Sequence, residues 1–471
     1  MTNSIALPEE SSSPSLQLGQ FVSELRYEQL PAEVIAKAKE LLADALGCAV
    51  GAMSLEPRKV QVARRLWQAI SQAGDCTVVG IGSADSHTAA LINGFLINAT
   101  DNDDTHKRAL LHAGSCLVPA SLAMAQRAKR SGTQMIEALV AGYEVCTRVG
   151  MAVMPSHYRF WHSTATNGQF GAAAAVARLL ELEPDQIRTA LNYAATQASG
   201  LNVFFETGDD SKSIHPGKAA LNGMLAAFFA QAGASSPKDS LVHPKGYLAA
   251  YSLDPKPAEL VTELGTRWEI LQNGIKLYPS ILASHSPIGA TLDIVRSHNF
   301  TADEIINIEI DTYPTVKSHF SSKLVQSEMA ARLSVPYCVA IAAVDKAVSQ
   351  EQFQLARIRN PDVQRVLAVT EVHSSESLAG LYPEKFPARV RIRLRDGRSL
   401  ESYHEYPKGD PSNPLSRSEF RDKFNKNTVP VMGEIKAETL WRVIMSIEDR
   451  PVADLTAILD QVRDESLIRD V

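Results

Sequence analysis

The stretch from Thr88 to Gly233 limits the fold most, because helical periodicity runs through it almost without a break. Apolar side chains recur on one helical face from Met135 to Cys146, and again from Ile187 to Ala198. Segments 171–177 and 219–234 are rich in alanine and glycine, and such small side chains let helix axes approach closely. We therefore expect this stretch to form the interior helices of one large all-α domain.

The pattern changes after about Asn273, where strands join the helices. Residues from Ile306 to Thr312 alternate between apolar and polar types, as a half-buried strand does. A second alternating run, from Val390 to Ser402, turns at Asp396-Gly397 and predicts a hairpin. Between these runs, residues 329–346 and 351–357 are predicted to be helical. The mixture of helices and strands is typical of an α+β domain.

These changes predict a mainly α protein with two domains. Residues 1–14, rich in Ser, Pro and Glu, are expected to form a disordered tail. Residues 15–272 and 405–471 are expected to form one discontinuous helical domain, because the segment after Ser416 is again helical. Residues 273–404 are expected to form a smaller α+β lid domain.

Composition narrows the classes of function. The 471 residues have 45% hydrophobic and 21% charged side chains, and their net charge is −6 with no basic block. Nucleic acid and anionic membranes are therefore not expected as partners, since both require concentrated Lys and Arg. The five cysteines are scattered, with no C-x-x-C pair, and no apolar run approaches the ~18 residues that cross a bilayer. With no signal-like start, a cytoplasmic protein is expected.

A charged segment lies between two apolar helical runs, residues 89–96 and 117–125. Proton-transferring and metal-ligating types are concentrated in this segment, whereas a buried helix would exclude them. A solvated connection between helices is the simpler interpretation of such a run. The members of this charged segment are Asp101, Asp103, Asp104, Thr105, His106 and His112.

Three further clusters favour a functional interpretation. His162 precedes an apolar helix, Lys212 and His215 lie just ahead of another, and Lys276 follows the proposed domain boundary. Histidine suits proton transfer near neutral pH, lysine binds carboxylates, and a helix N-terminus offers N–H groups to an anion. Taken together, the clusters predict a site for a small molecule with several carboxylates.

Other chemistries receive less support from the sequence. A metal held by Asp101, Asp103, Asp104 and His112 ranks below a metal-free acid–base site, because no H-x-x-x-H or EF-hand spacing is present. The nucleotide-binding motifs G-x-x-x-x-G-K-[ST] and G-x-G-x-x-G after a strand are absent, as is the G-x-S-x-G elbow. Nucleotide-dependent and serine-hydrolase chemistry are therefore disfavoured.

Seven motifs between about Leu18 and Phe424 carry a family resemblance. They are Asn93-Gly94 with Asp101-x-Asp103-Asp104-Thr105; Ala141-Gly142-Tyr143-Glu144-Val145; His162-Ser163-Thr164-Ala165-Thr166-x-Gly168-x-Phe170-Gly171-Ala172; Lys212-x-x-His215-x-Gly217-x-Ala219-Ala220; Lys276-x-Tyr278-Pro279; Ala331-x-x-Ser334-x-Pro336-Tyr337; and Lys408-Gly409-x-Pro411-x-x-Pro414-Leu415-Ser416 with Lys423-Phe424. In these motifs the chain resembles the MmgE/PrpD family, which includes 2-methylcitrate dehydratase, cis-aconitate decarboxylase and iminodisuccinate epimerase.

The resemblance implies a large helical domain, a smaller α+β lid, a cleft between them and a homodimer. It also implies chemistry without a cofactor or iron–sulfur cluster. The chain departs from the family pattern at Asn102 and at His112-Ala113, which follows an unusual insert at residues 107–111, so His106 is a rival for the position of the family's histidine. The active-site candidates carried over by position are Asp101, Thr105, His112, His162, Lys212, Lys276 and Tyr337, the last from the resemblance alone.

The favoured hypothesis is a cofactor-independent lyase acting on a small di- or tricarboxylic acid. Lys212 and Lys276 would bind carboxylates, with His215 and His106 as further binding candidates. His112 or His162 would move the proton at the carbon α to a carboxylate. Dehydration of the 2-methylcitrate type is expected because it is the family's commonest role. Decarboxylation of the cis-aconitate type, epimerisation of an imino- or hydroxy-diacid, and carboxylate binding without catalysis are the alternatives.

Overall fold

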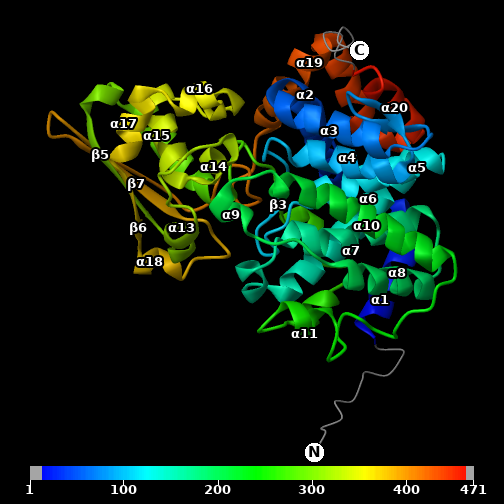
Figure 1. The fold of residues 1–471 in the computed structure, drawn as a ribbon. Helices are drawn as coiled ribbons and strands as arrows, with labels where there is room; N and C mark the ends of the chain where they lie inside the picture. Colours follow the sequence, from blue (N-terminus) through cyan, green and yellow to red (C-terminus); the bar gives the residue numbers. More distant parts are fainter. Residues whose placement is uncertain (1–12, 463–471) are drawn as a thin grey trace, which may run out of the picture.

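The computed structural model describes residues 13–462, and two hydrophobic cores organise them. One core draws on residues 18–275 and again on 415–462, whereas the other draws on residues 278–394. Figure 1 shows the corresponding lobes side by side, a large helical one and a smaller one built on a sheet. The prediction of a mainly α fold with a smaller α+β part is confirmed.

The helical lobe contains most of the chain's helices and two short ribbons. Its helices are α1 (Pro14–Glu24), α2 (Ala32–Leu55), α3 (Pro57–Ile70), α4 (Ser86–Asn98), α5 (Gly114–Arg127), α6 (Gly132–Val153), α7 (Ser163–Leu179), α8 (Pro184–Gln197), α9 (Phe204–Thr207), α10 (Ser211–Gln231), α11 (Tyr247–Tyr251), α19 (Arg417–Met445) and α20 (Val452–Leu459). Its ribbons pair β1 (Cys76–Val78) with β2 (Gly82–Ala84) and β3 (Thr105–His106) with β4 (Asn273–Gly274), both antiparallel. The expected all-α domain therefore has these small β additions.

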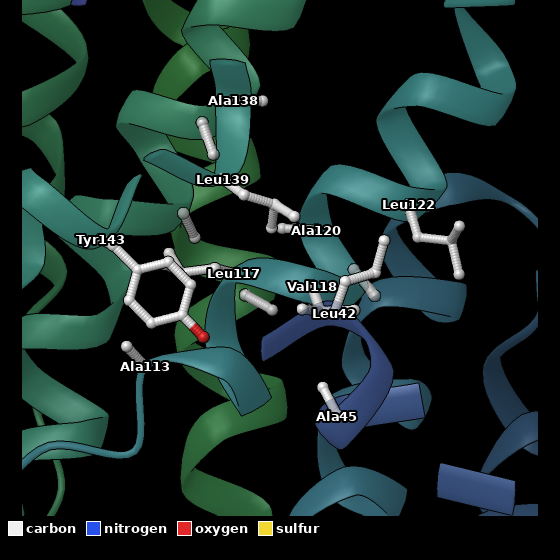
Figure 2. Packing of buried hydrophobic residues seen from close by; sticks show 14 of the residues in the cluster. Leu42, Ala45, Ala113, Leu117, Val118, Ala120, Leu122, Ala138, Leu139 and Tyr143 are labelled. Atoms are coloured by element: carbon white, nitrogen blue, oxygen red, sulfur yellow. The ribbon is translucent and has the colours of Figure 1, made fainter. Parts of the chain in front are cut away.

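Small residues set the distance between the interior helices. A Cβ atom on Gly217 of α10 would lie 2.1 Å from the carbonyl oxygen of Leu91 in α4, so only glycine permits this crossing. Leucine, valine and alanine side chains of α2, α5 and α6 interdigitate beside the ring of Tyr143 (Figure 2). α7 packs against α5, α6 and α10. Its first turn is consequently held at the centre of the lobe.

The second lobe has a four-stranded sheet covered by helices. The sheet order is β6-β5-β7-β8, with β5 and β6 parallel and the other neighbours antiparallel. The predicted hairpin is confirmed as β7 and β8, with Gly397 in the turn at φ 92°. The elements of this lobe are β5 (Ile305–Thr312), β6 (Thr370–Ser374), β7 (Ala388–Leu394), β8 (Ser399–His404), α12 (His285–Ser297), α13 (Pro314–His319), α14 (Glu328–Leu333), α15 (Val335–Asp345), α16 (Leu355–Ile358), α17 (Pro361–Ala368) and α18 (Glu376–Ala379).

Local details differ from the sequence-based expectations. Ile306 is 53% exposed and Ile305 is buried instead, because the pairing of β5 with β7 shifts between Ile305 and Asn307 as in a β-bulge. The single helix expected over 329–346 is broken at Ser334, which has an extended backbone and caps α15 just ahead of Pro336. Residues 1–12 of the expected tail lie outside the described residues, and Pro14 already begins α1.

The two lobes are joined at Ala99 and Thr100, directly after α4. The carbonyl oxygen of Ala99 accepts hydrogen bonds from Lys59 of the helical lobe (2.5 Å) and from Arg332 of the other lobe (3.3 Å). Gln350 donates to the carbonyl of Thr100 (3.3 Å). Figure 1 places β3, α9 and α14 in the same region between the lobes. Within residues 13–462, no helix has the length and apolar character that a membrane crossing requires.

Candidate active site

The centre of the candidate site is Asp101, which pairs with two lysines from distant parts of the chain. Its Oδ1 accepts from Nζ of Lys212 (2.8 Å) and from Nζ of Lys276 (2.6 Å). Lys276 also donates to the backbone carbonyl of Asp101 (2.8 Å). All three side chains are at most 3% exposed. The structure therefore joins three of the predicted residues into one buried ionic cluster.

The charges in this cluster set its protonation. Burial alone would raise the pKa of Asp101, but the charges of Lys212 and Lys276 outweigh burial and hold that pKa well below its usual range. Burial lowers the pKa of Lys276, although Asp101 opposes the shift. Among the described residues, no hydrogen bond reaches Oδ2 of Asp101. With one carboxylate for two ammonium groups, the cluster carries one surplus positive charge.

A pair of histidines forms the second part of the site. The Nδ1 atoms of His162 and His215 lie 2.9 Å apart, so one ring donates a hydrogen bond to the other. The ring of Phe204 packs edge-on against both, with centroids 4.9 Å from His162 and 5.9 Å from His215. Burial lowers the pKa of both histidines, that of His215 to about 4, and both are therefore neutral at pH 7.

His112 is the third part, with its ring centroid 6.4 Å from that of His162. Its Nδ1 lies 2.8 Å from the carbonyl oxygen of Asp104, and its backbone N–H donates to Oγ1 of Thr164 (3.1 Å). A carbonyl oxygen only accepts, so Nδ1 carries the proton and Nε2 has a free lone pair. Burial and the charge of Lys276 lower the pKa of His112 to about 4, against the opposing effect of Asp103. His112 is thus a neutral base in the free protein.

The structure places three other predicted residues at different distances from this cluster. Thr105 pairs with Gly274 in the small ribbon and lines the same small cavity as Lys276, so it lies beside the cluster. His106 is fully buried and points to Glu269, with Nε2 3.4 Å from that carboxylate. Tyr337 lies in the core of the α+β lobe, where its hydroxyl donates to the carbonyl of Gln352. His106 and Tyr337 are therefore not brought into the cluster.

The local backbone corrects one expectation about helix starts. α7 begins at Ser163, directly after His162, as expected. α10 begins at Ser211, however, so Lys212 and His215 lie inside its first two turns rather than ahead of it. The free N–H groups at the start of α10 consequently lie at and beside Lys212, whereas those after His215 belong to the helix interior.

Several buried polar residues that were not among the predicted site residues support the charged segment. Asn98 donates to both carboxylate oxygens of Asp103 at 2.9 Å. Nζ of Lys423 donates to Asp44 (2.5 Å) and to the carbonyl of Asn102 (2.7 Å). Lys423 follows Phe420 by three positions and so shares its apolar helix face. A charge on such a face was the available signal for a buried ion pair.

The MmgE/PrpD N-terminal domain model matches residues 16–260, and the MmgE/PrpD C-terminal domain model matches residues 278–449. Within residues 13–462, no group of three or more His, Cys, Asp or Glu side chains is placed to hold a metal ion.

The similar proteins are named as decarboxylases or as decarboxylase-like. A cis-aconitate decarboxylase-like protein of Aspergillus oryzae is 29% identical, covering 98% of this chain and 99% of its own length. Cis-aconitate decarboxylase of Aspergillus terreus is 28% identical over 98% of each chain, and the human one is 24% identical over 90% of each. Since the two family models together span most of the sequence, the chain belongs to the MmgE/PrpD family of lyase-type enzymes.

Proposed function

We propose that the chain is a cofactor-independent lyase that decarboxylates a small tricarboxylic acid of the cis-aconitate type. The observation that carries this proposal is the buried Asp101–Lys212–Lys276 cluster beside three neutral histidines. The surplus positive charge of the cluster suits an anion, and the histidines supply the proton chemistry. The full-length similarity to cis-aconitate decarboxylases supports decarboxylation over the dehydration that the sequence alone favoured.

Two lysines sharing one carboxylate oxygen form a ready site for substrate carboxylates. In the free protein Lys212 and Lys276 both bind Oδ1 of Asp101. Each ammonium group has three donors, so each retains capacity for a substrate oxygen. Asp101 keeps the two ammonium groups in place and limits their mutual repulsion. Preorganised cations stabilise negative charge that develops during reaction, because they require little rearrangement.

The bond changes of the proposed reaction balance without an oxidant or reductant. In cis-aconitate, one carboxylate is attached to a CH2 group next to the carbon–carbon double bond. Its loss as CO2 breaks one C–C bond, and the electron pair spreads over the three-carbon allylic unit. The far carbon of that unit is α to another carboxylate and takes up one proton. His112, with its free Nε2 position, is the proposed donor of that proton after it has been protonated.

Dehydration of a 2-methylcitrate-type acid is the second candidate. It requires removal of a proton α to a carboxylate, for which neutral His112 is already a base in the free protein. Epimerisation would require acid–base groups on both faces of one carbon. His112 and the His162–His215 pair are the groups available for such a pair of faces.

An NMR time course separates these reactions. EDTA-treated protein is incubated in D2O with cis-aconitate, 2-methylcitrate and iminodisuccinate in parallel. The expected result is loss of CO2 from cis-aconitate, with one deuterium in the product. Conversion of the methyl doublet of 2-methylcitrate into the singlet of a methyl group on a carbon–carbon double bond would establish the dehydratase instead. Deuterium exchange without another product would establish an epimerase. If no acid changes, the proposed substrate class is wrong.

Matched histidine variants test the catalytic assignment. His112→Gln is expected to lower kcat by about 10²- to 10⁴-fold, the usual contribution of general acid–base catalysis. His157→Gln is the control, because His157 is also a buried histidine but binds Tyr251 and Thr166 away from the cluster. His106→Gln gives the contribution of His106, the rival for the catalytic position, to kcat. A larger loss of kcat at position 106 than at position 112 would contradict the assignment.

The homodimer remains a prediction from the family resemblance. Light scattering from the purified protein is expected to give about twice the 51.2 kDa mass of one chain. A mass of one chain at micromolar concentration would contradict it.

A further inference from the structure

Asp104 binds residues 112–114, the segment that carries His112, through both its backbone and its side chain. Its backbone carbonyl oxygen accepts from Nδ1 of His112 (2.8 Å), and its Oδ1 accepts from the backbone N–H of Gly114 (2.9 Å). A single residue therefore fixes the histidine ring and also the chain two residues beyond it. The side chain of Asp104 is buried, so water does not compete for these bonds.

The second carboxyl oxygen of Asp104 ties the segment to α6. Oδ2 accepts from the hydroxyl of Tyr143 (3.1 Å), a fully buried residue of α6. A Cβ atom on Gly114 would lie 2.5 Å from Oδ1 of Asp104 and 2.9 Å from the hydroxyl of Tyr143. Position 114 consequently has no space for a side chain while Asp104 keeps this geometry.

Between Asp104 and His112, the insert at residues 107–111 forms a separate turn. His106 and Leu111 exchange two backbone hydrogen bonds, of 2.8 and 3.3 Å, and so close the turn at its base. The carbonyl of Ala109 accepts from Ser163 at the start of α7 (2.6 Å). Residues 107–110 are therefore contained in this turn, and His112, directly after it, lies beside Thr164.

Electrostatics favour a neutral carboxyl at position 104. Burial raises the pKa of Asp104 to about 8, and the neighbouring carboxylates of Asp103 and Asp44 add to the shift. In the neutral form Oδ1 still accepts from Gly114, while a proton on Oδ2 is donated to the hydroxyl oxygen of Tyr143, so the side chain keeps both partners without adding negative charge next to His112. The nearby cationic cluster therefore remains free to act on the substrate.

We propose that Asp104, supported by Tyr143, is a positioning residue that fixes the tautomer and the direction of the His112 ring. Asp104 does not touch the reacting atoms; it acts through His112. The kinetic part of this inference rests on the proposed function, whereas the structural part concerns the free protein alone. The role differs from that of Asp101, whose partners are lysines.

The direct test is the tautomer of His112 in the full-length protein. The protein is labelled with 15N at histidine side chains, and the His112 signals are assigned by their loss in His112→Gln. In the natural sequence, proton on Nδ1 and lone pair on Nε2 are expected at pH 7. Asp104→Ala is expected to give a mixture of tautomers, and Asp104→Asn to retain the natural one because an amide oxygen still accepts from Gly114.

Tyr143→Phe and a matched variant complete the tautomer test. Tyr143→Phe is expected to shift the His112 signals partway, because Oδ2 of Asp104 loses its partner. Tyr247→Phe is the control, since its hydroxyl is also buried but binds Asn167 (2.8 Å). An unchanged His112 tautomer in Asp104→Ala would overturn the inference, as would equal shifts in the two tyrosine variants.

Kinetics provide the second readout. Asp104→Ala is expected to lower kcat by about 10- to 100-fold with little change in KM, because the ring is misplaced while Lys212 and Lys276 still bind carboxylates. Asp104→Asn is expected to restore most of kcat. A rise in KM with unchanged kcat would contradict a positioning role. If the natural protein transforms no acid, the proposed function fails, but the NMR comparison still decides the role of Asp104.

Discussion

Replacing Asp101 by asparagine should destabilise the protein more than removing either of its lysine partners. Asn keeps the size and one acceptor oxygen of Asp. It also tolerates the left-handed backbone of this position, where φ is 53°, so the change removes charge without adding backbone strain. Lys212 and Lys276 would then face each other as two buried ammonium groups with no carboxylate between them.

The expected magnitude follows from burial. Breaking a buried ion pair by removing one partner costs about 3–5 kcal/mol, because the remaining charge is left unpaired. Lys276→Met removes one of the two lysines instead and leaves the Asp101–Lys212 pair neutral overall. Its cost is expected to be roughly 1–3 kcal/mol, the range for lost hydrogen bonds to charged groups. Asp101→Asn should therefore be less stable than Lys276→Met.

The assay is urea unfolding followed by circular dichroism, with both variants measured at pH 7 and at pH 9. Burial already lowers the pKa of Lys276, and in Asp101→Asn that pKa is depressed further in the folded state because the opposing carboxylate charge is gone. A depressed lysine pKa makes stability rise with pH, because the unfolded chain binds more protons. The loss of unfolding free energy in Asp101→Asn, relative to the natural protein, is therefore expected to be smaller at pH 9 than at pH 7. The loss in Lys276→Met should stay nearly constant.

Two results would refute this reasoning. Equal stability of Asp101→Asn and the natural protein would mean that the lysines are not charged or not close in solution. A larger loss in Lys276→Met would mean that packing, not charge balance, dominates the cluster. Adding a tricarboxylate to the natural protein checks that the folded state binds this ligand. At 100 times its Kd, a ligand that binds only the folded state raises the free energy of unfolding by about 2.7 kcal/mol.

Three further predictions concern pH and packing. If protonated His112 is the proton donor in decarboxylation, kcat/KM should rise as pH falls from 8 to 5. The reason is that the pKa of His112 in the free protein is about 4, so the protonated fraction grows over this whole range. A flat profile would favour proton removal by neutral His112. Burial lowers the pKa of His157 to about 4, so this histidine should contribute roughly 3 kcal/mol to the loss of stability as pH drops from about 6.5 to 4. His157→Gln should make that loss smaller by this share, and an unchanged loss would contradict the buried, neutral state of His157. Gly114→Ala should lower the melting temperature and kcat together, since its methyl group would overlap Asp104; unchanged values would show that the segment relaxes easily.

The residue types of the site were predictable from sequence because charged side chains and histidines are uncommon next to long apolar helical runs. Asp101 belongs to a charged segment between two apolar helical runs, Lys212 to a polar cluster ahead of an apolar helix, and Lys276 to the segment after the proposed domain boundary; each was selected on that ground. Their pairing was not predictable, because 111 and 175 residues separate Asp101 from the two lysines. Only the packing of α4 on α10, and the ribbon that pairs Thr105 with Gly274, bring them together.

Spacing alone did not show which direction a side chain takes. His106 and His112 are both histidines of one charged segment, yet the turn closed by His106 and Leu111 sends the first ring toward Glu269 and leaves the second beside His162. Ile306 is a similar case in a strand, where one irregular pairing reverses the buried face. A single residue of shift changes the neighbour completely, and composition does not report it.

The electrostatics of the site connect substrate binding with proton uptake. In the free protein, burial and the charges of Lys276 and Lys212 keep His112 neutral, so it has no proton to deliver. Substrate carboxylates placed against the lysines would offset that positive charge and raise the pKa of His112. The ring would then take up a proton because the substrate is bound. A site with neutral histidines can thus become a proton donor without a separate acid, and Asp104 leaves Nε2 as the nitrogen that receives the proton.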